Sequence, residues 1–132
     1  MSTLEGITLP DDLQWIDEFD WLPVSQQVEV STGGALIVEE FAQQRGRPIT
    51  LEGRMEGNVG FAMIRRDVLL ALRALAAVAR TAPMALTLDD GRTFHVLFRH
   101  DDGVAVTAKP LKHIVPAQDA DLYSITIRLM EA

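Results

Sequence analysis

Three histidines and two copies of an Asp-Asp-Gly tripeptide are the residues whose chemistry could bind a metal or serve a reaction. The histidines are His95, His100 and His113, and the tripeptides occupy residues 89–91 and 101–103. Histidine spacings of five and thirteen residues match no zinc signature. A calcium loop ends in a bidentate glutamate, which neither tripeptide supplies. We therefore expect neither a metal nor another cofactor.

Combinations of a nucleophile and a base are also missing from the sequence. The chain has no cysteine, and no serine lies in a Gly-x-Ser-x-Gly motif. Neighbouring carboxylates such as Asp11-Asp12 would point to opposite faces of a strand, so adjacency does not create an acid–base pair. These observations predict a protein that is not an enzyme. A small ligand-binding or enzymatic β-barrel is the alternative, with His95, His100 and Asp101 as its candidate residues.

The residues on either side of the tripeptides alternate between apolar and polar types. Segments 84–88, 93–98 and 104–108 each show this period of two, which is typical of strands. An Asp-Gly pair between alternating segments is a strong hairpin signal. We therefore expect both tripeptides to be tight turns, joining the three segments into an antiparallel meander.

Further strands are predicted on both sides of this meander. Gly33-Gly34 separates two alternating segments and predicts a hairpin with one half-polar face, and residues 49–51 begin another strand. The glycines within 53–60 do not follow a phosphate-binding spacing, so we interpret them as a turn or bulge. The closing strand, residues 123–129, is expected to direct inward Tyr123, Ile125, Ile127 and Leu129.

One segment, Arg65 to Arg80, has the periodicity of a helix. Its apolar residues form a wide stripe at helical spacing, and Asp67 lies in the first turn, where the helix dipole favours a carboxylate. Arg66, Arg73 and Arg80 recur every seven residues and follow nearly one line of the helix. They form either a solvated basic ridge or a ridge that receives the acidic N-terminal segment of the same or the next subunit.

The order of these elements predicts the fold class. Strands before and after a single helix indicate a mainly β protein, an antiparallel β-sandwich or partial barrel flanked by one α-helix. A length of 132 residues predicts a single domain over residues 1–132, with residues 1–24 as an acidic N-terminal arm. The sequence shows neither a signal peptide nor an apolar segment long enough for a membrane span, so we expect a soluble protein.

Charge is distributed unevenly along the chain. The net charge is −7, and residues 1–44 contain nine acidic residues but no lysine or arginine. An acidic chain has no electrostatic reason to bind nucleic acid or an anionic membrane. The acidic segment is either a solvated face or a subunit interface. Within it, the aromatic residues Trp15, Phe19 and Trp21 are either buried locally or anchored on a neighbouring molecule.

The sequence as a whole resembles a group of viral structural proteins. Segments 13–40, 44–53, 67–76, 84–106 and 122–132 are similar to the small tail and baseplate proteins of tailed bacteriophages, of the tail-tube and distal-tail type. Proteins of this type combine a β-sandwich or incomplete barrel with one flanking helix and a long hairpin. The length of this chain fits a minimal tube-like adaptor near the baseplate.

The resemblance implies a structural function. It implies a homo-oligomeric ring, commonly a hexamer, that contacts other tail tube, baseplate or hub proteins in the virion tail and is made in the cytoplasm of the bacterial host. DNA would be only a passing cargo, and a head–tail joining or tail-terminator ring is the alternative. Residues 25–41 would correspond to the hairpin that completes a sheet between subunits. The resulting interface hypothesis comprises Trp15, Phe19, Trp21, Val28, Val30, Leu36, Val38, Arg66, Arg73 and Arg80.

Overall fold

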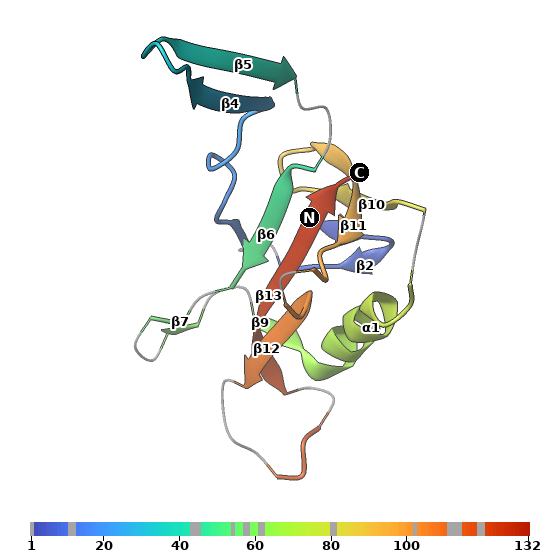
Figure 1. The fold of residues 1–132 in the computed structure, drawn as a ribbon. Helices are drawn as coiled ribbons and strands as arrows, with labels where there is room; N and C mark the ends of the chain where they lie inside the picture. Colours follow the sequence, from blue (N-terminus) through green and yellow to red (C-terminus); the bar gives the residue numbers. More distant parts are fainter. Residues whose placement is uncertain are drawn as a thin grey trace.

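The computed structural model describes residues 2–10, 13–42, 46–53, 55–56, 59–60, 63–79, 82–101, 103–110, 115–118 and 121–132. Most of its strands belong to one antiparallel sheet, and a single helix accompanies them (Figure 1). The elements are β1 Thr3–Leu4, β2 Ile7–Thr8, β3 Gln14–Trp15, β4 Val24–Val30, β5 Leu36–Ala42, β6 Pro48–Glu52, β7 Met55–Glu56, β8 Val59–Gly60, β9 Met63–Arg65, α1 Arg66–Ala76, β10 Met84–Thr87, β11 Thr93–Phe98, β12 Val106–Pro110 and β13 Leu122–Glu131.

Strand β13 is the centre of the main sheet. Its alternating residues Ile125, Ile127 and Leu129 are completely buried, as the sequence pattern predicts, while Tyr123 packs against the edge of the same core. β11 and β12 lie one after the other along one edge of β13, and β6 and β9 lie along its other edge. The longest strand is therefore hydrogen-bonded on both sides, and its inward face carries much of the core.

The strands on either side of the second Asp-Asp-Gly tripeptide do not form the predicted hairpin, and Asp102 of that tripeptide lies outside the described residues. β12 pairs with β13 rather than with β11, so the expected three-stranded meander is wrong. Arg99 N–H donates to the Arg128 carbonyl, and Arg128 N–H donates to the Ala105 carbonyl. The chain therefore leaves this edge of β13 after Arg99 and rejoins it at Ala105. The local Asp-Gly signal identified a chain reversal, but the backbone hydrogen-bonding groups of β13 determine where the chain returns.

The first Asp-Asp-Gly tripeptide does form a tight hairpin. β10 and β11 pair in register from Met84 opposite Val96 to Thr87 opposite Thr93. Leu88 and Arg92 close the loop through the bond from Leu88 N–H to the Arg92 carbonyl, and Gly91 has φ of 89°. A three-residue loop that ends in a left-handed glycine is a common hairpin connection, because glycine adopts this conformation without a steric penalty.

The main sheet is strongly curved. Its strand order is β2-β1-β10-β11-β13-β6-β3, so two strands that are consecutive in the chain, β2 and β3, lie at opposite ends. Seven flat strands would place those ends about 29 Å apart. The connection from Thr8 to Gln14 spans at most about 21 Å, so the sheet must curl. The fold is an open, partial barrel with one helix, and the predicted fold class is confirmed.

The N-terminal segment is built into this sheet. β1 pairs with β10 and β2 pairs with β1, while Leu4 and Leu9 lie fully within the core. β3 pairs with β6 at the other end of the sheet. The described residues of the expected arm, up to about Glu18, therefore lie along the sheet of their own subunit. Asp11 and Asp12 lie outside the described residues.

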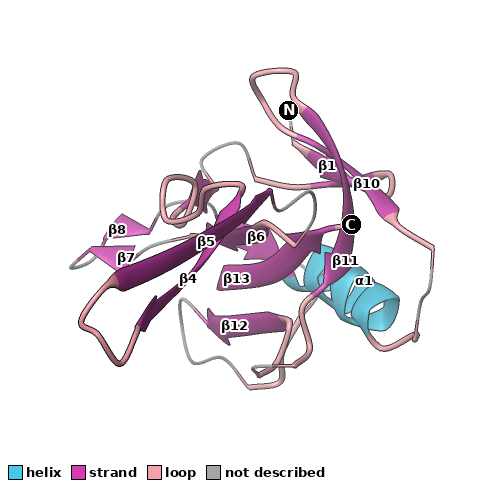
Figure 2. Cartoon of the chain, turned by 45° about the horizontal axis from the view of Figure 1, so that its top comes forward, coloured by secondary structure: helices cyan, strands magenta, loops and turns pink. Residues whose placement is uncertain are grey.

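The helix packs against the sheet through one face, and it is shorter than the sequence predicts. α1 contacts β2, β9, β12 and β13, with Leu69 and Leu72 buried beneath it, and Figure 2 shows it against one side of the strands. It ends at Ala76 rather than at Arg80, with Ala77 N–H bonded to the Arg73 carbonyl. Val78 and Ala79 then line a hollow together with Leu97 and Phe98 of β11.

Two small sheets lie outside the main one. β7 and β8 form a short pair between β6 and β9, within the glycine-containing segment expected to turn. β4 and β5 form a long hairpin that pairs only within itself and stands away from the rest of the molecule (Figure 1). The predicted hairpin around Gly33-Gly34 is confirmed, and its position makes it the main surface feature of the protein.

Candidate functional site

The candidate site is the β4–β5 hairpin. Its seven cross-strand pairs run from Val24 opposite Ala42 to Val30 opposite Leu36. Ser31 closes the tip, because its backbone N–H donates to the Ala35 carbonyl and its hydroxyl accepts from the Ala35 N–H. Gly34 takes φ of 84°, which the sequence anticipated by placing two glycines there. The register is therefore fixed by local chemistry.

The two faces of the hairpin differ in character. Directly paired residues share a face, and successive residues alternate between faces. This rule separates one largely apolar face from one that is more acidic. We call the first the apolar face. It comprises Val24, Val28, Val30, Leu36, Val38 and Ala42, with Gln26 and Glu40 between them. The opposite face comprises Ser25, Gln27, Glu29, Ile37, Glu39 and Phe41.

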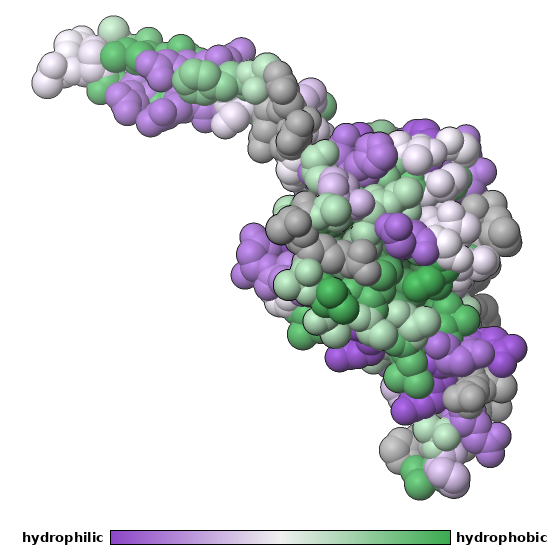
Figure 3. All heavy atoms as spheres, turned by 90° about the vertical axis from the view of Figure 1, so that its right-hand side faces the viewer, coloured by the Kyte–Doolittle hydropathy of each residue, from purple (hydrophilic) through white to green (hydrophobic). Residues whose placement is uncertain are grey.

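No layer formed by the described residues covers the apolar face. Val30 is 70% exposed, Leu36 is 65% exposed, and every residue of β4 and β5 is exposed. The principal contacts of these strands are with each other. An isolated two-stranded hairpin is marginally stable in water, and contiguous exposed apolar side chains mark interaction sites. Figure 3 shows apolar and polar surfaces side by side along this narrow extension.

The charged residues of the hairpin are all acidic. Glu29, Glu39 and Glu40 are its charged residues, and residues 24–42 contain no lysine or arginine. The Gln26 amide donates to the Glu40 carboxylate over 2.7 Å, which satisfies the polar pair on the apolar face. Electrostatic complementarity would favour a partner surface that carries a positive or neutral group opposite Glu40, the carboxylate on the apolar face.

The four predicted hairpin residues, Val28, Val30, Leu36 and Val38, are brought together on the apolar face. The sequence interpretation missed Val24 on this face and the exposed Ile37 and Phe41 on the other. The alternation of the two segments contained the signal for Val24, because it lies four residues before Val28 and therefore on the same face of the strand.

The aromatic residues of the acidic segment occupy three different environments. Trp15 packs against its own subunit, with its ring edge-on to Phe94 at 5.6 Å between centroids. Trp21 is partly buried, whereas Phe19 is 90% exposed at the base of the hairpin. Of the predicted anchors, Phe19 is therefore the one available to a neighbouring molecule, and Trp15 is mainly part of its own fold.

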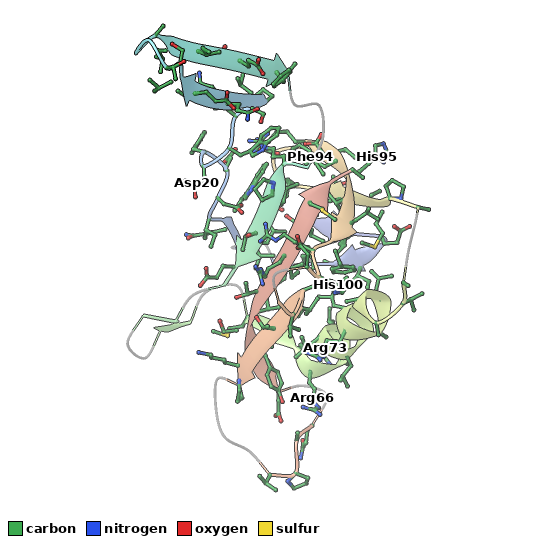
Figure 4. The ribbon with its side chains drawn as sticks, in the orientation of Figure 1. Asp20, Arg66, Arg73, Phe94, His95 and His100 are labelled. Atoms are coloured by element: carbon green, nitrogen blue, oxygen red, sulfur yellow. The ribbon has the colours of Figure 1, made fainter. Side chains whose placement is uncertain are left out.

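The basic residues of the helix lie far from the hairpin. The Arg66 guanidinium donates to the Tyr123 hydroxyl over 2.7 Å, and that of Arg73 donates to the Val106 carbonyl over 3.0 Å. Figure 4 shows both at the end of the molecule remote from Asp20 and the hairpin. Within one subunit, the described acidic residues do not dock on these arginines. Arg80 lies outside the described residues.

Two candidate residues of the alternative, catalytic interpretation, His95 and His100, line different surface hollows. His95 lies in β11, and His100 and Asp101 follow the end of that strand, while His113 lies outside the described residues. Among the described residues, no group of three or more histidine or carboxylate side chains could hold a metal ion. His100 lines an open hollow of about 280 Å³ with Arg73 and the apolar residues 104–106.

The chain was compared with known proteins. Models of protein families, curated proteins and solved structures all give no match. Within the described part of the chain, there is no helix with the length and apolar character needed to cross a membrane. The similarity to phage tail proteins therefore remains an expectation from the sequence.

Proposed function

We propose that this protein is a structural subunit that associates with copies of itself through the β4–β5 hairpin, as a ring-forming component of a bacteriophage tail or baseplate. The single observation that carries the assembly function is the hairpin itself, which stands off the sheet with its apolar face exposed. Such a face gains stability when a second protein surface covers it, because apolar area then leaves water.

A hairpin that reaches away from the body favours a particular kind of assembly. When it contacts a different surface on the next copy, the contact is heterologous, and repetition of a heterologous contact closes into a ring if the rotation permits. The fold class supports the tail assignment, since an open β-barrel with one helix and a long hairpin is what the sequence resemblance implies. A hexamer is the ring size that this resemblance suggests.

The charge of the protein suits the proposed location in a virion tail. A net charge of −7 repels DNA, so a ring of such subunits would let a duplex pass without holding it. In this proposal DNA is a passing cargo, other tail tube and baseplate or hub proteins are the partners, and the protein performs no catalysis.

The test is the mass of the purified protein by light scattering at several concentrations and two ionic strengths. We expect a mass that rises from the 14.6 kDa of one chain to that of a closed ring, and images of negatively stained particles with a central opening. A mass of one chain at every concentration would contradict self-assembly. Open filaments or simple dimers would contradict the ring.

A further inference from the structure

A cluster of side chains lies where the hairpin joins the body. The chain enters the hairpin after β3 and returns from it into β6, and the cluster contains residues from both passages. We name it the hairpin-base cluster, comprising Trp15, Glu18, Arg47 and Arg92. Arg92 comes from the β10–β11 turn, far away in the sequence.

Trp15 is the centre of the hairpin-base cluster. The guanidinium carbon of Arg47 lies 4.6 Å from the centroid of the Trp15 ring, and that of Arg92 lies 5.3 Å from it. A cation over an indole ring is attracted by the negative face of the ring, and more strongly where water is excluded. Two such contacts make Trp15 a common support for one residue of the returning chain and one residue of the β10–β11 turn.

Glu18 accepts hydrogen bonds from both arginines. Arg47 donates to its carbonyl oxygen over 2.9 Å, and Arg92 donates to Oε1 of its carboxylate over 2.8 Å. Hydrogen bonding to Glu18 raises the pKa of Arg92, as does its bond with Asp90, against the opposing effect of burial. The entering and returning passages are thus joined directly, and both are joined to the sheet through the β10–β11 turn.

Asp17, the residue before Glu18, fixes the entering passage to β6. Asp17 accepts from the backbone N–H of Thr50 over 2.9 Å and from its hydroxyl over 2.8 Å. The next residue after the cluster, Phe19, is 90% exposed. Among the described residues, these side-chain contacts hold the entering passage at Asp17 and Glu18 and the returning passage at Arg47.

We infer that the hairpin-base cluster positions the hairpin: it holds the direction in which β4 and β5 leave the body. Trp15, Glu18, Arg47 and Arg92 are positioning residues for the contact that the hairpin makes with another copy. The importance of this cluster for assembly rests on the proposed function. The claim that the cluster sets the direction of the hairpin does not rest on it. A pre-oriented hairpin loses less conformational freedom when it binds, so association is stronger.

The test measures the direction of the hairpin inside one chain. The sequence has no cysteine, so two cysteines can be introduced at exposed positions for spin labels, by Gln27→Cys in β4 and Thr107→Cys in β12. The labelled protein is diluted with unlabelled protein, so that only distances between two labels on the same chain are measured. We expect a narrow distance distribution in the otherwise unchanged protein and a broader, shifted distribution after Arg47→Gln with Arg92→Gln. An unchanged distribution would overturn the inference.

Two further measurements complete this test. Arg65→Gln is the matched control, because Arg65 pairs with Asp67 over 3.3 Å beside the helix, and it should leave the distribution unchanged. If the double variant does not fold, the labelled parent is measured in 1 M salt. The Debye length there is about 3 Å, which weakens the Arg92–Glu18 pair. A distribution as narrow in 1 M salt as in dilute buffer would then overturn the inference.

Light scattering on the same variants separates the two proposals. A hairpin that reorients without any change in association would contradict the assembly function and leave the positioning inference intact. Association with a hairpin whose direction does not depend on the cluster would contradict only the positioning inference.

Discussion

Replacing the cross-strand pair at the tip of the hairpin, Val30→Ser with Leu36→Ser, should weaken assembly without unfolding the subunit. These side chains are 70% and 65% exposed, so the folded monomer gains little from them. Full burial of a valine or leucine contributes about 1.5–3 kcal/mol, so covering the exposed parts contributes roughly 2–4 kcal/mol for the pair. Since about 1.4 kcal/mol is a tenfold change in affinity, the Kd should rise roughly 30- to 700-fold.

The assay is sedimentation equilibrium over a concentration series, with urea unfolding of the same samples. Because exposed positions usually change stability by less than about 0.5 kcal/mol, the unfolding midpoint should move little. The matched control is Gln27→Ser with Glu39→Ser, a cross-strand pair on the opposite face, which should associate no more weakly than the parent. A folded double variant at the tip with unchanged association would refute the assignment of the apolar face as the assembly surface.

Three predictions concern the fold. Asp17→Ala should lower the free energy of unfolding by roughly 1–3 kcal/mol, because two donors of β6 lose their acceptor, and urea unfolding would detect it; an unchanged value would contradict this. Gly91→Ala should cost about 1–2 kcal/mol through its φ of 89°, whereas Gly33→Ala, which meets only Ser31 at 3.9 Å, should cost far less; equal effects would exclude backbone strain. Hydrogen bonds from Arg92, first from its backbone N–H, lower the pKa of Asp90 from 3.8. Because the folded pKa is the lower one, the stabilisation is complete above pH 3.8 and is lost as the pH falls through the folded value. Unfolding at pH 5 and pH 3 should thus show a smaller loss for Asp90→Asn than for the parent.

The individual elements were predictable because their signals are local. Alternation predicted β4, β5, β10, β11 and β13, and a period near 3.6 predicted α1. Gly34 and Gly91 were predictable as turn residues because only a few residue types tolerate a positive φ. The four apolar residues of the hairpin interface hypothesis also share the face that the alternation assigns to them.

The pairing of the strands was less predictable, because the same alternating sequence fits more than one partner. An Asp-Gly pair after β11 indicated a hairpin, but β13 offered a longer run of backbone donors and acceptors, and β12 pairs there instead. The hairpin-base cluster was missed for the same reason. Arg47 and Arg92 are ordinary polar-loop residues in the sequence. The pairing of β3 with β6 brings Arg47 to Trp15, and the curling of the sheet brings Arg92 there.

By itself the sequence determined the β-rich class, the single helix, the long hairpin with its glycine turn and the acidic character of the first 44 residues, since periodicity and composition are properties of neighbouring residues. Only the tertiary structure decided that the hairpin stands uncovered while Trp15, Arg66 and Arg73 make contacts within their own subunit. The physical reason is that exposure depends on what else folds against a residue. Contacts between distant segments of the chain set that outcome.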